Sequence, residues 1–172
     1  MSEQKNINVE MNDSLNDSKP FVKPLVDRAD HRMDVKRRFS LPISWYERMG
    51  APQQLYTMIS LSGQNCIDVF TPEEFDKKFK PLREKALSNE NAANFVSRLG
   101  ELVSVVSIDS AKRLRIKEQY LSYIGIGLAD ENIVLIGANN KFEIWSLKNR
   151  PLERIDRDYV EETRKLAREF DF

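Results

Sequence analysis

The sequence predicts an α+β protein in which two similar halves share one core. Three observations support this prediction. The chain repeats itself at an offset of 75 residues, short alternating apolar segments are typical of strands, and apolar residues three and four positions apart are typical of helices. The length of 172 residues fits one compact domain or two small halves. Such halves imply a pseudo-twofold axis, because each unit completes the core of the other.

An internal repeat carries most of this prediction. In both halves an arginine follows an aspartate by four positions, and the apolar segments behind these pairs keep the same offset. The matched positions are Asp34 with Asp109, Arg38 with Arg113, Phe39 with Leu114, Leu41 with Ile116, Gly50 with Gly125, and Ile67–Phe70 with Phe142–Trp145. We therefore divide the chain into a disordered leader (1–24), a first half (25–100), a second half (101–150) and an amphipathic tail (151–172).

Each half is expected to follow the same order of elements. A strand ends at the aspartate, a basic turn follows, and a second short strand leads to a short helix and two further strands. Gly50 and Gly125 stand where the end of a helix favours a left-handed residue. The expected helices are Ile43–Met49 and Lys117–Ile124, and the expected strands lie near 55–61, 67–70, 131–136 and 142–145.

Longer helices are predicted between the halves and after them. Thr71 is a good N-cap, Pro72 suits the first helical position, and Glu74 stands at the third position of a capping box. The predicted helices are 72–82 and 91–99, and a strand follows at 102–108. The tail combines apolar residues at helical spacing with many acidic residues, which indicates a helix that packs on the body or on a neighbouring subunit.

Composition excludes several classes of protein. Hydrophobic residues make up 41% and charged residues 31%, and no apolar run approaches the roughly 18 residues of a membrane span. The polar N-terminus lacks the apolar segment of a signal peptide, so we expect a cytoplasmic protein. One cysteine and one histidine give no zinc ligand set and no histidine-based catalytic triad. No glycine-rich phosphate motif is present, so we expect no enzyme, cofactor or small-molecule substrate.

The duplicated Asp-x-x-x-Arg pattern resembles the MraZ family of bacterial transcriptional regulators. His31 precedes Asp34 by three positions, as in the family's H-x-x-D start. The runs CIDVFTPEEFDKKFKPL (66–82) and VLIGANNKFEIW (134–145) are similar to the family's strand–helix and hairpin segments, and the resemblance covers roughly residues 25–150. It implies a pseudo-twofold, duplicated swapped-hairpin β-barrel with short flanking helices, as in AbrB-type DNA-binding proteins, and a ring-like homo-oligomer.

The chain departs from the family pattern within both turns. Family members usually have glycine before the motif arginine, where this chain has Arg37 and Lys112, and Lys117 replaces a common proline. Glycine implies a turn with positive φ, which costs another residue roughly 1 kcal/mol or more. We expect either a reshaped turn or a strained turn that is tolerated because each replacement adds a cation.

The basic residues of the two turns form the candidate DNA-binding site. They are Lys36, Arg37 and Arg38 in the first half and Lys112, Arg113 and Arg115 in the second. Arginine suits this role because its planar fork matches both phosphates and guanine edges. Asp34 and Asp109 would not contact DNA favourably, because both the carboxylates and the phosphates are negatively charged. We expect them to accept hydrogen bonds from the turn or to pair with the motif arginines and fix their direction.

The expected partners are double-stranded DNA with tandem repeats and other copies of the chain. Lys+Arg and Asp+Glu both count 27, so only a local excess of basic residues can favour DNA. Two small clusters per subunit would bind weakly, whereas an oligomer multiplies them. The resemblance further implies nucleoid association and repression of a division and cell-wall gene cluster.

Three alternatives remain open from the sequence. In the first, the turns are solvated tips whose surface ion pairs contribute ~0–1 kcal/mol each. In the second, the protein is a degenerate MraZ-like oligomeric interaction module without DNA binding, as the two lost glycines, zero net charge and acidic tail indicate. In the third, it is the antitoxin-like partner of a toxin. The other notable side chains are interpreted structurally: His31 as a packing or hairpin residue, Cys66 as a small core residue, and Trp45 and Trp145 as core or interface anchors.

Overall fold

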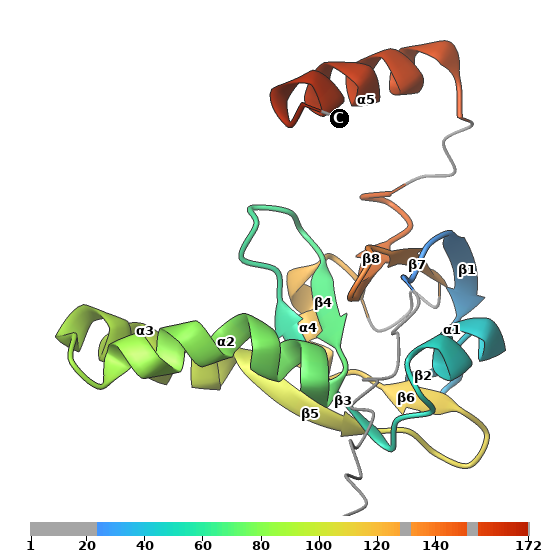
Figure 1. The fold of residues 1–172 in the computed structure, drawn as a ribbon. Helices are drawn as coiled ribbons and strands as arrows, with labels where there is room; N and C mark the ends of the chain where they lie inside the picture. The colour runs from blue at the N-terminus through green and yellow to red at the C-terminus, as the bar shows by residue number, and fades with distance from the viewer. Residues whose placement is uncertain (1–23, 128–131, 151–154, 172) are drawn as a thin grey trace, which may run out of the picture.

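The computed structural model describes residues 24–127, 132–150 and 155–171 (Figure 1). Residues 1–23 of the expected leader and residues 151–154 and 172 of the expected tail lie outside this part. The elements are β1 (Arg28–Arg32), β2 (Arg38–Ser40), α1 (Ile43–Arg48), β3 (Gln54–Ile59), β4 (Ile67–Phe70), α2 (Pro72–Ala86), α3 (Glu90–Leu102), β5 (Val103–Ser107), β6 (Arg113–Arg115), α4 (Glu118–Tyr123), β7 (Asn132–Gly137), β8 (Phe142–Ser146) and α5 (Arg157–Glu169). The predicted α+β class is confirmed. None of the helices described is long and apolar enough to span a membrane.

The main sheet is antiparallel and has six strands in the order β1-β7-β8-β4-β3-β5. The two halves exchange strands, because β1 pairs with β7 of the second half and β5 pairs with β3 of the first. In the repeat, β1 corresponds to β5, β3 to β7 and β4 to β8. Replacing each strand by its counterpart gives the same strand order read from the opposite edge of the sheet. The sheet therefore has a pseudo-twofold axis between β4 and β8. The described residues form no closed barrel, and the swapped-hairpin barrel stays a prediction.

A separate two-stranded ribbon, β2–β6, lies on the same pseudo-twofold axis. Phe39 faces Leu114 in its register, and both side chains are fully buried. The main core combines residues of both halves, including Trp45, whose ring centroid lies 5.7 Å from that of Phe142. The shared core that the repeat predicts is therefore present, and Trp45 is one of its members.

The short helices α1 and α4 end in the same way. Gly50 and Gly125 follow them with φ of +78° and +82°, as the sequence predicts. After α1, the Gly50 N–H donates to the Glu47 carbonyl (3.0 Å) and the Ala51 N–H donates to the Tyr46 carbonyl (2.9 Å). This pair of bonds is the Schellman arrangement, which satisfies the last carbonyls of a helix. α4 ends in the matching pair of bonds, so the repeat extends to the helix ends.

Helix α2 begins as predicted but is longer. The Thr71 hydroxyl accepts a hydrogen bond from the Glu74 N–H (3.2 Å), which confirms the N-cap. The helix continues through Pro81 to Ala86, beyond the expected end at 82. Its apolar side packs on a second core cluster that includes Phe70 and Leu99. This tertiary packing extends the helix past a residue that cannot donate the helical hydrogen bond.

We predict that His31 makes folding sensitive to mild acid. The side chain lies on β1 with its ring centroid 6.4 Å from that of Phe39, and burial lowers its pKa below 6.5 despite the nearby Asp30 carboxylate. The unfolded chain therefore binds a proton more readily, so this contribution is complete above pH 6.5 and is lost as pH falls through the lower folded-state pKa. Between pH 7.5 and 5, the melting temperature should fall further for the wild type than for His31→Gln. Equal falls would contradict the prediction.

Candidate nucleic-acid interface

Both Asp-x-x-x-Arg turns are held by the same set of hydrogen bonds. Asp34 Oδ1 accepts from the N–H groups of Lys36 and Arg38 (both 2.9 Å), and its Oδ2 accepts from Arg38 Nε (2.8 Å). In the second turn, Asp109 binds the Arg113 N–H and side chain with the same distances of 2.9 and 2.8 Å. Each carboxylate therefore closes its turn and fixes the direction of its arginine, as the sequence predicts.

The ribbon β2–β6 brings the two turns to the same edge of the molecule (Figure 1). In its register Arg38 faces Arg115 and Ser40 faces Arg113, while the alternate residues enter the core. Arg38 Nη1 lies 4.0 Å from Asp109 Oδ2, so an ion pair connects the two turns. The outward face of the ribbon therefore presents three arginines side by side.

The carboxylates of the turns stay ionised at all physiological pH values. The hydrogen bonds from the Arg38 side chain and N–H lower the pKa of Asp34 to about 2. The pKa of Asp109 is lowered in the same way by Arg113, whose own pKa is raised by Asp109. The side chains of Arg38 and Arg113 are 29% and 35% exposed, so part of each remains accessible to a binding partner.

The two residues that replace glycine keep the positive φ of the turn. Arg37 and Lys112 both have φ of +60°, so the turns are strained rather than reshaped. Arg37 Nη2 donates to the Gly127 carbonyl (3.1 Å), and its Nε lies 3.4 Å from a Glu118 carboxylate oxygen. Lys112 Nζ lies 4.4 Å from the ring centroid of Tyr46 and 3.3 Å from its hydroxyl.

These contacts connect each turn to the opposite half. Arg37 of the first half contacts the start of α4, and Lys112 of the second half contacts α1. Arg37 and Lys112 occupy equivalent positions in the repeat, but their side chains differ in exposure. The Arg37 side chain is only 8% exposed, so its charge faces Glu118 rather than solvent. Lys112 remains partly exposed beside Tyr46. Sequence spacing alone does not reveal this difference, because it depends on packing between the halves.

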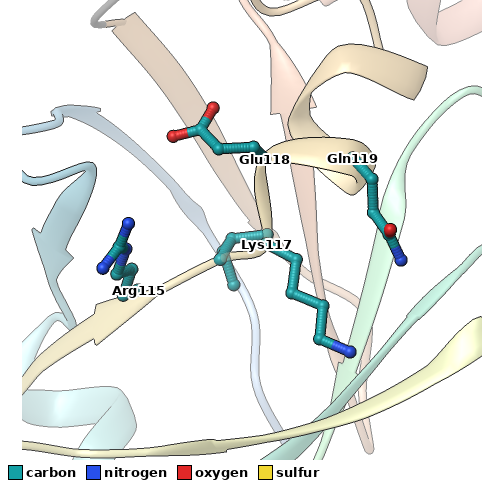
Figure 2. Close-up of a pocket in the computed structure, with 5 residues that line it drawn as sticks. Arg115, Lys117, Glu118 and Gln119 are labelled. Atoms are coloured by element: carbon teal, nitrogen blue, oxygen red, sulfur yellow. The ribbon is translucent and has the colours of Figure 1, made fainter.

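An open hollow adjoins the second turn, where β6 leads into α4 (Figure 2). Its volume is about 520 Å³, and its lining includes Arg115, Lys117, Glu118 and Gln119. Figure 2 shows the side chains of Lys117 and Glu118 pointing away from each other. Lys117 is therefore a further cation beside the turns. The sequence does not mark it as a site residue, because it lies outside both Asp-x-x-x-Arg turns.

A cluster of Cys66, Asp68 and Glu143 has the spacing of metal ligands among the described residues. The ammonium group of Lys141 lies 2.5 Å from Asp68 Oδ1 and 2.8 Å from Glu143 Oε1, so a protein cation already pairs with both carboxylates. Burial, with both carboxylates nearby, raises the pKa of the Cys66 thiol to about 12. A metal prefers the thiolate, so this cluster is structural.

We predict that the strain at positions 37 and 112 is measurable as a difference between alanine and glycine. Arg37→Ala and Arg37→Gly remove the same contacts, but only alanine keeps a side chain at positive φ. The alanine variant should be less stable by about 1 kcal/mol. The same difference is expected between Lys112→Ala and Lys112→Gly. Urea unfolding measures both pairs, and equal stabilities within each pair would show that the turns are not strained.

The fold and the site define a class of protein: a duplicated α+β chain whose halves exchange strands and present two arginine turns at one edge. No family model matches the chain. It is similar, however, to curated proteins named transcriptional regulator MraZ. The match to the protein of Alkaliphilus oremlandii is 25% identical over 121 residues, which is 70% of this chain and 80% of the relative. The match to the Clostridium tetani protein is 29% identical over 122 residues with the same shares. The chain is therefore similar, over about 70% of its length, to proteins named transcriptional regulator MraZ.

Proposed function

We propose that this protein is a sequence-specific DNA-binding transcriptional regulator. The observation that carries the proposal is the β2–β6 ribbon, on which two aspartate-fixed arginines lie side by side with Arg115. A two-stranded ribbon fits the major groove of DNA, and an arginine can bind both acceptors of a guanine edge. The relatives' shared name, transcriptional regulator, supports a regulator rather than an enzyme.

Each basic residue has a proposed part in the contact. Arg38 and Arg113 read base edges, because their carboxylate partners fix their direction before DNA arrives. The proposed phosphate contacts are Lys36, Lys112 and Arg115. Asp34 and Asp109 position the arginines and do not contact DNA. Arg37 belongs to the support of the turn, because its side chain is buried against α4.

The proposed assembly is a ring-like homo-oligomer on tandem sites. A single subunit presents few cations, so its affinity is low, whereas several subunits on one DNA molecule gain effective concentration. The proposal includes the swapped-hairpin barrel, a cytoplasmic and nucleoid-associated location, and repression of a division and cell-wall gene cluster. Tandem repeats upstream of such genes are the proposed operator.

An interaction module without DNA binding is the second candidate. One observation favours it: each motif arginine already has a carboxylate partner at 2.7 or 2.8 Å, which reduces the charge that a phosphate would meet. On this interpretation the Asp–Arg pairs only stabilise the turns. The two candidates differ in their response to polyanions.

Salt dependence separates these two candidates. We expect the full-length protein to bind DNA that contains its upstream repeats, with an affinity that falls steeply with salt. The slope of log K against log salt should approach about −0.9 for each phosphate neutralised. Scrambled DNA of equal length at equal ionic strength serves as the control. A shallow slope with no preference for the repeats would favour the interaction module.

A further inference from the structure

An open apolar groove lies between α2, α3 and β5, away from the arginine turns. Its volume is about 260 Å³, and its apolar lining includes Phe75, Phe79, Val96, Leu99 and Val105. Val105 is 50% exposed, and Phe95 and Leu102 on the adjacent face of α3 are 44% and 37% exposed. Apolar side chains that gather on one exposed face in this way mark an interaction site.

Helix α5 has an uncovered apolar face of its own. Tyr159, Leu166 and Phe170 lie on one side of it at helical spacing, with exposures of 41%, 56% and 78%, and none of its residues is buried. The helix has an N-cap, because the Asp156 carboxylate accepts a hydrogen bond from the Tyr159 N–H at 2.9 Å. Figure 1 shows α5 apart from the sheet and from α2 and α3. Its apolar face therefore lacks a partner within the described chain.

We propose that α5 of one copy docks its apolar face in the groove between α2, α3 and β5 of a second copy. The inference rests on the oligomer of the proposed function and names the segment that connects its subunits. An amphipathic helix in an apolar groove is a common mode of recognition, with anchors at spacings such as those of Tyr159, Leu166 and Phe170.

The charges beside the two surfaces are complementary. Asp158, Glu162 and Glu169 follow one flank of the α5 stripe, at spacings of four and seven residues. On the other surface, Arg83 lines the groove, where it also pairs with Asp76, and Arg98 is exposed one helical turn after Phe95 on α3. Docking with the acidic flank toward these arginines pairs opposite charges at the rim while the apolar side chains enter the groove.

A second copy, rather than the same chain, is the proposed source of the helix. The single chain carries both surfaces, yet no residue of its α5 lines the groove. Each copy would provide one helix and receive another, which is a heterologous contact. Such contacts close into rings when the rotation between copies permits. The contact lies on α2, α3 and β5, so it leaves the β2–β6 ribbon accessible.

Disulfide trapping between two variants tests this contact directly. Val105→Cys places a thiol in the groove, and Leu166→Cys places one on the apolar face of α5. The two full-length proteins are mixed, oxidised, blocked with excess alkylating agent and compared on a non-reducing gel. Any disulfide between the two engineered thiols must join two copies, because each variant carries only one of them. In an equal, randomly mixed population each engineered thiol meets its complement in half of the contacts, so we expect up to about half of the protein to migrate as a covalent dimer.

Glu161→Cys, on the polar side of α5, is the matched control and should give only background cross-linking with Val105→Cys. The natural Cys66 is fully buried and keeps a thiol pKa of about 12, so it should not contribute. Equal cross-linking of Leu166→Cys and Glu161→Cys, or none, overturns the proposal. A double variant, Val105→Cys/Leu166→Cys, that forms only an intramolecular disulfide also overturns it, because the helix would then dock on its own chain.

Light scattering separates this inference from the proposed function. Leu166→Asp/Phe170→Asp should reduce the mass of the wild-type oligomer without unfolding the body, since α5 has no buried residue. Glu161→Ala should leave the mass unchanged. If the double variant keeps the wild-type mass and its binding to repeated DNA, the α5 contact is wrong while the regulator stands. If the assembly is lost as expected but wild-type protein shows no DNA preference, the contact stands and the regulator is wrong.

Discussion

Replacing Arg38 and Arg113 together by alanine should abolish preferential binding to repeated DNA and flatten its salt dependence. The two guanidinium groups lie on one ribbon and are aimed by Asp34 and Asp109, so the change removes both proposed base contacts from every subunit. Each loss should cost ~1–3 kcal/mol per engaged site. Fluorescence anisotropy with labelled repeat DNA and with scrambled DNA, at several salt concentrations, measures the effect.

The matched control removes the same charge elsewhere. Lys80→Ala/Lys85→Ala deletes two exposed cations on α2 and should leave the preference for the repeats intact. Circular dichroism must accompany the binding measurement, because the arginine changes also leave Asp34 and Asp109 without their side-chain partners. Wild-type affinity in a folded Arg38/Arg113 double variant would defeat the proposed mechanism and leave the interaction module as the better explanation.

Replacing Lys141 by methionine should destabilise the fold strongly. Asp68 and Glu143 face each other across β4 and β8, and the Lys141 ammonium group lies between them at 2.5 and 2.8 Å. Removing the shared cation leaves two carboxylates together in a nearly buried site, and breaking a buried ion pair from one side typically costs about 3–5 kcal/mol. Urea unfolding of the variant at pH 7 should show a loss of this size.

A pH series identifies the cause of that loss. Without Lys141 the two carboxylates repel each other in the folded variant, and protonation of either one relieves this repulsion. The Lys141→Met deficit relative to wild type should therefore shrink from pH 7 to pH 5. Adding Asp68→Asn should restore part of the stability, while Lys80→Met on the surface should change little. A deficit that does not depend on pH would attribute the loss to packing alone.

Local features of this protein could be predicted well from its sequence. The repeat, the glycines after α1 and α4, and the N-cap at Thr71 depend on neighbouring residues, and the structure confirms them. The Asp–Arg pairing of the turns was also predicted, because a carboxylate four residues before an arginine can close the turn between them. At Arg37 the sequence allowed either a reshaped turn or a strained one, and the positive φ of the structure shows that the turn is the strained one.

Features that depend on long-range packing could not be predicted in this way. The exchange of β1 and β5 between the halves requires knowledge of which strands become neighbours. Burial of Arg37 depends on α4, which lies far along the chain, so spacing placed this residue among the exposed cations. The approach of Lys141 to Asp68 follows from the register between β4 and β8, which no local pattern encodes.

The pseudo-twofold axis relates turns that are similar but not identical. Lys36 in the first turn corresponds to Ala111 in the second, and the exposed Ser40 corresponds to Arg115. A symmetric homodimer reads a palindrome and has no direction along DNA, whereas a chain with two unequal turns has a front and a back. If both turns contact DNA, each copy binds in one defined orientation along the duplex. Copies related by the rotation of a ring would share that orientation. Such an assembly fits binding sites that are direct repeats rather than inverted repeats.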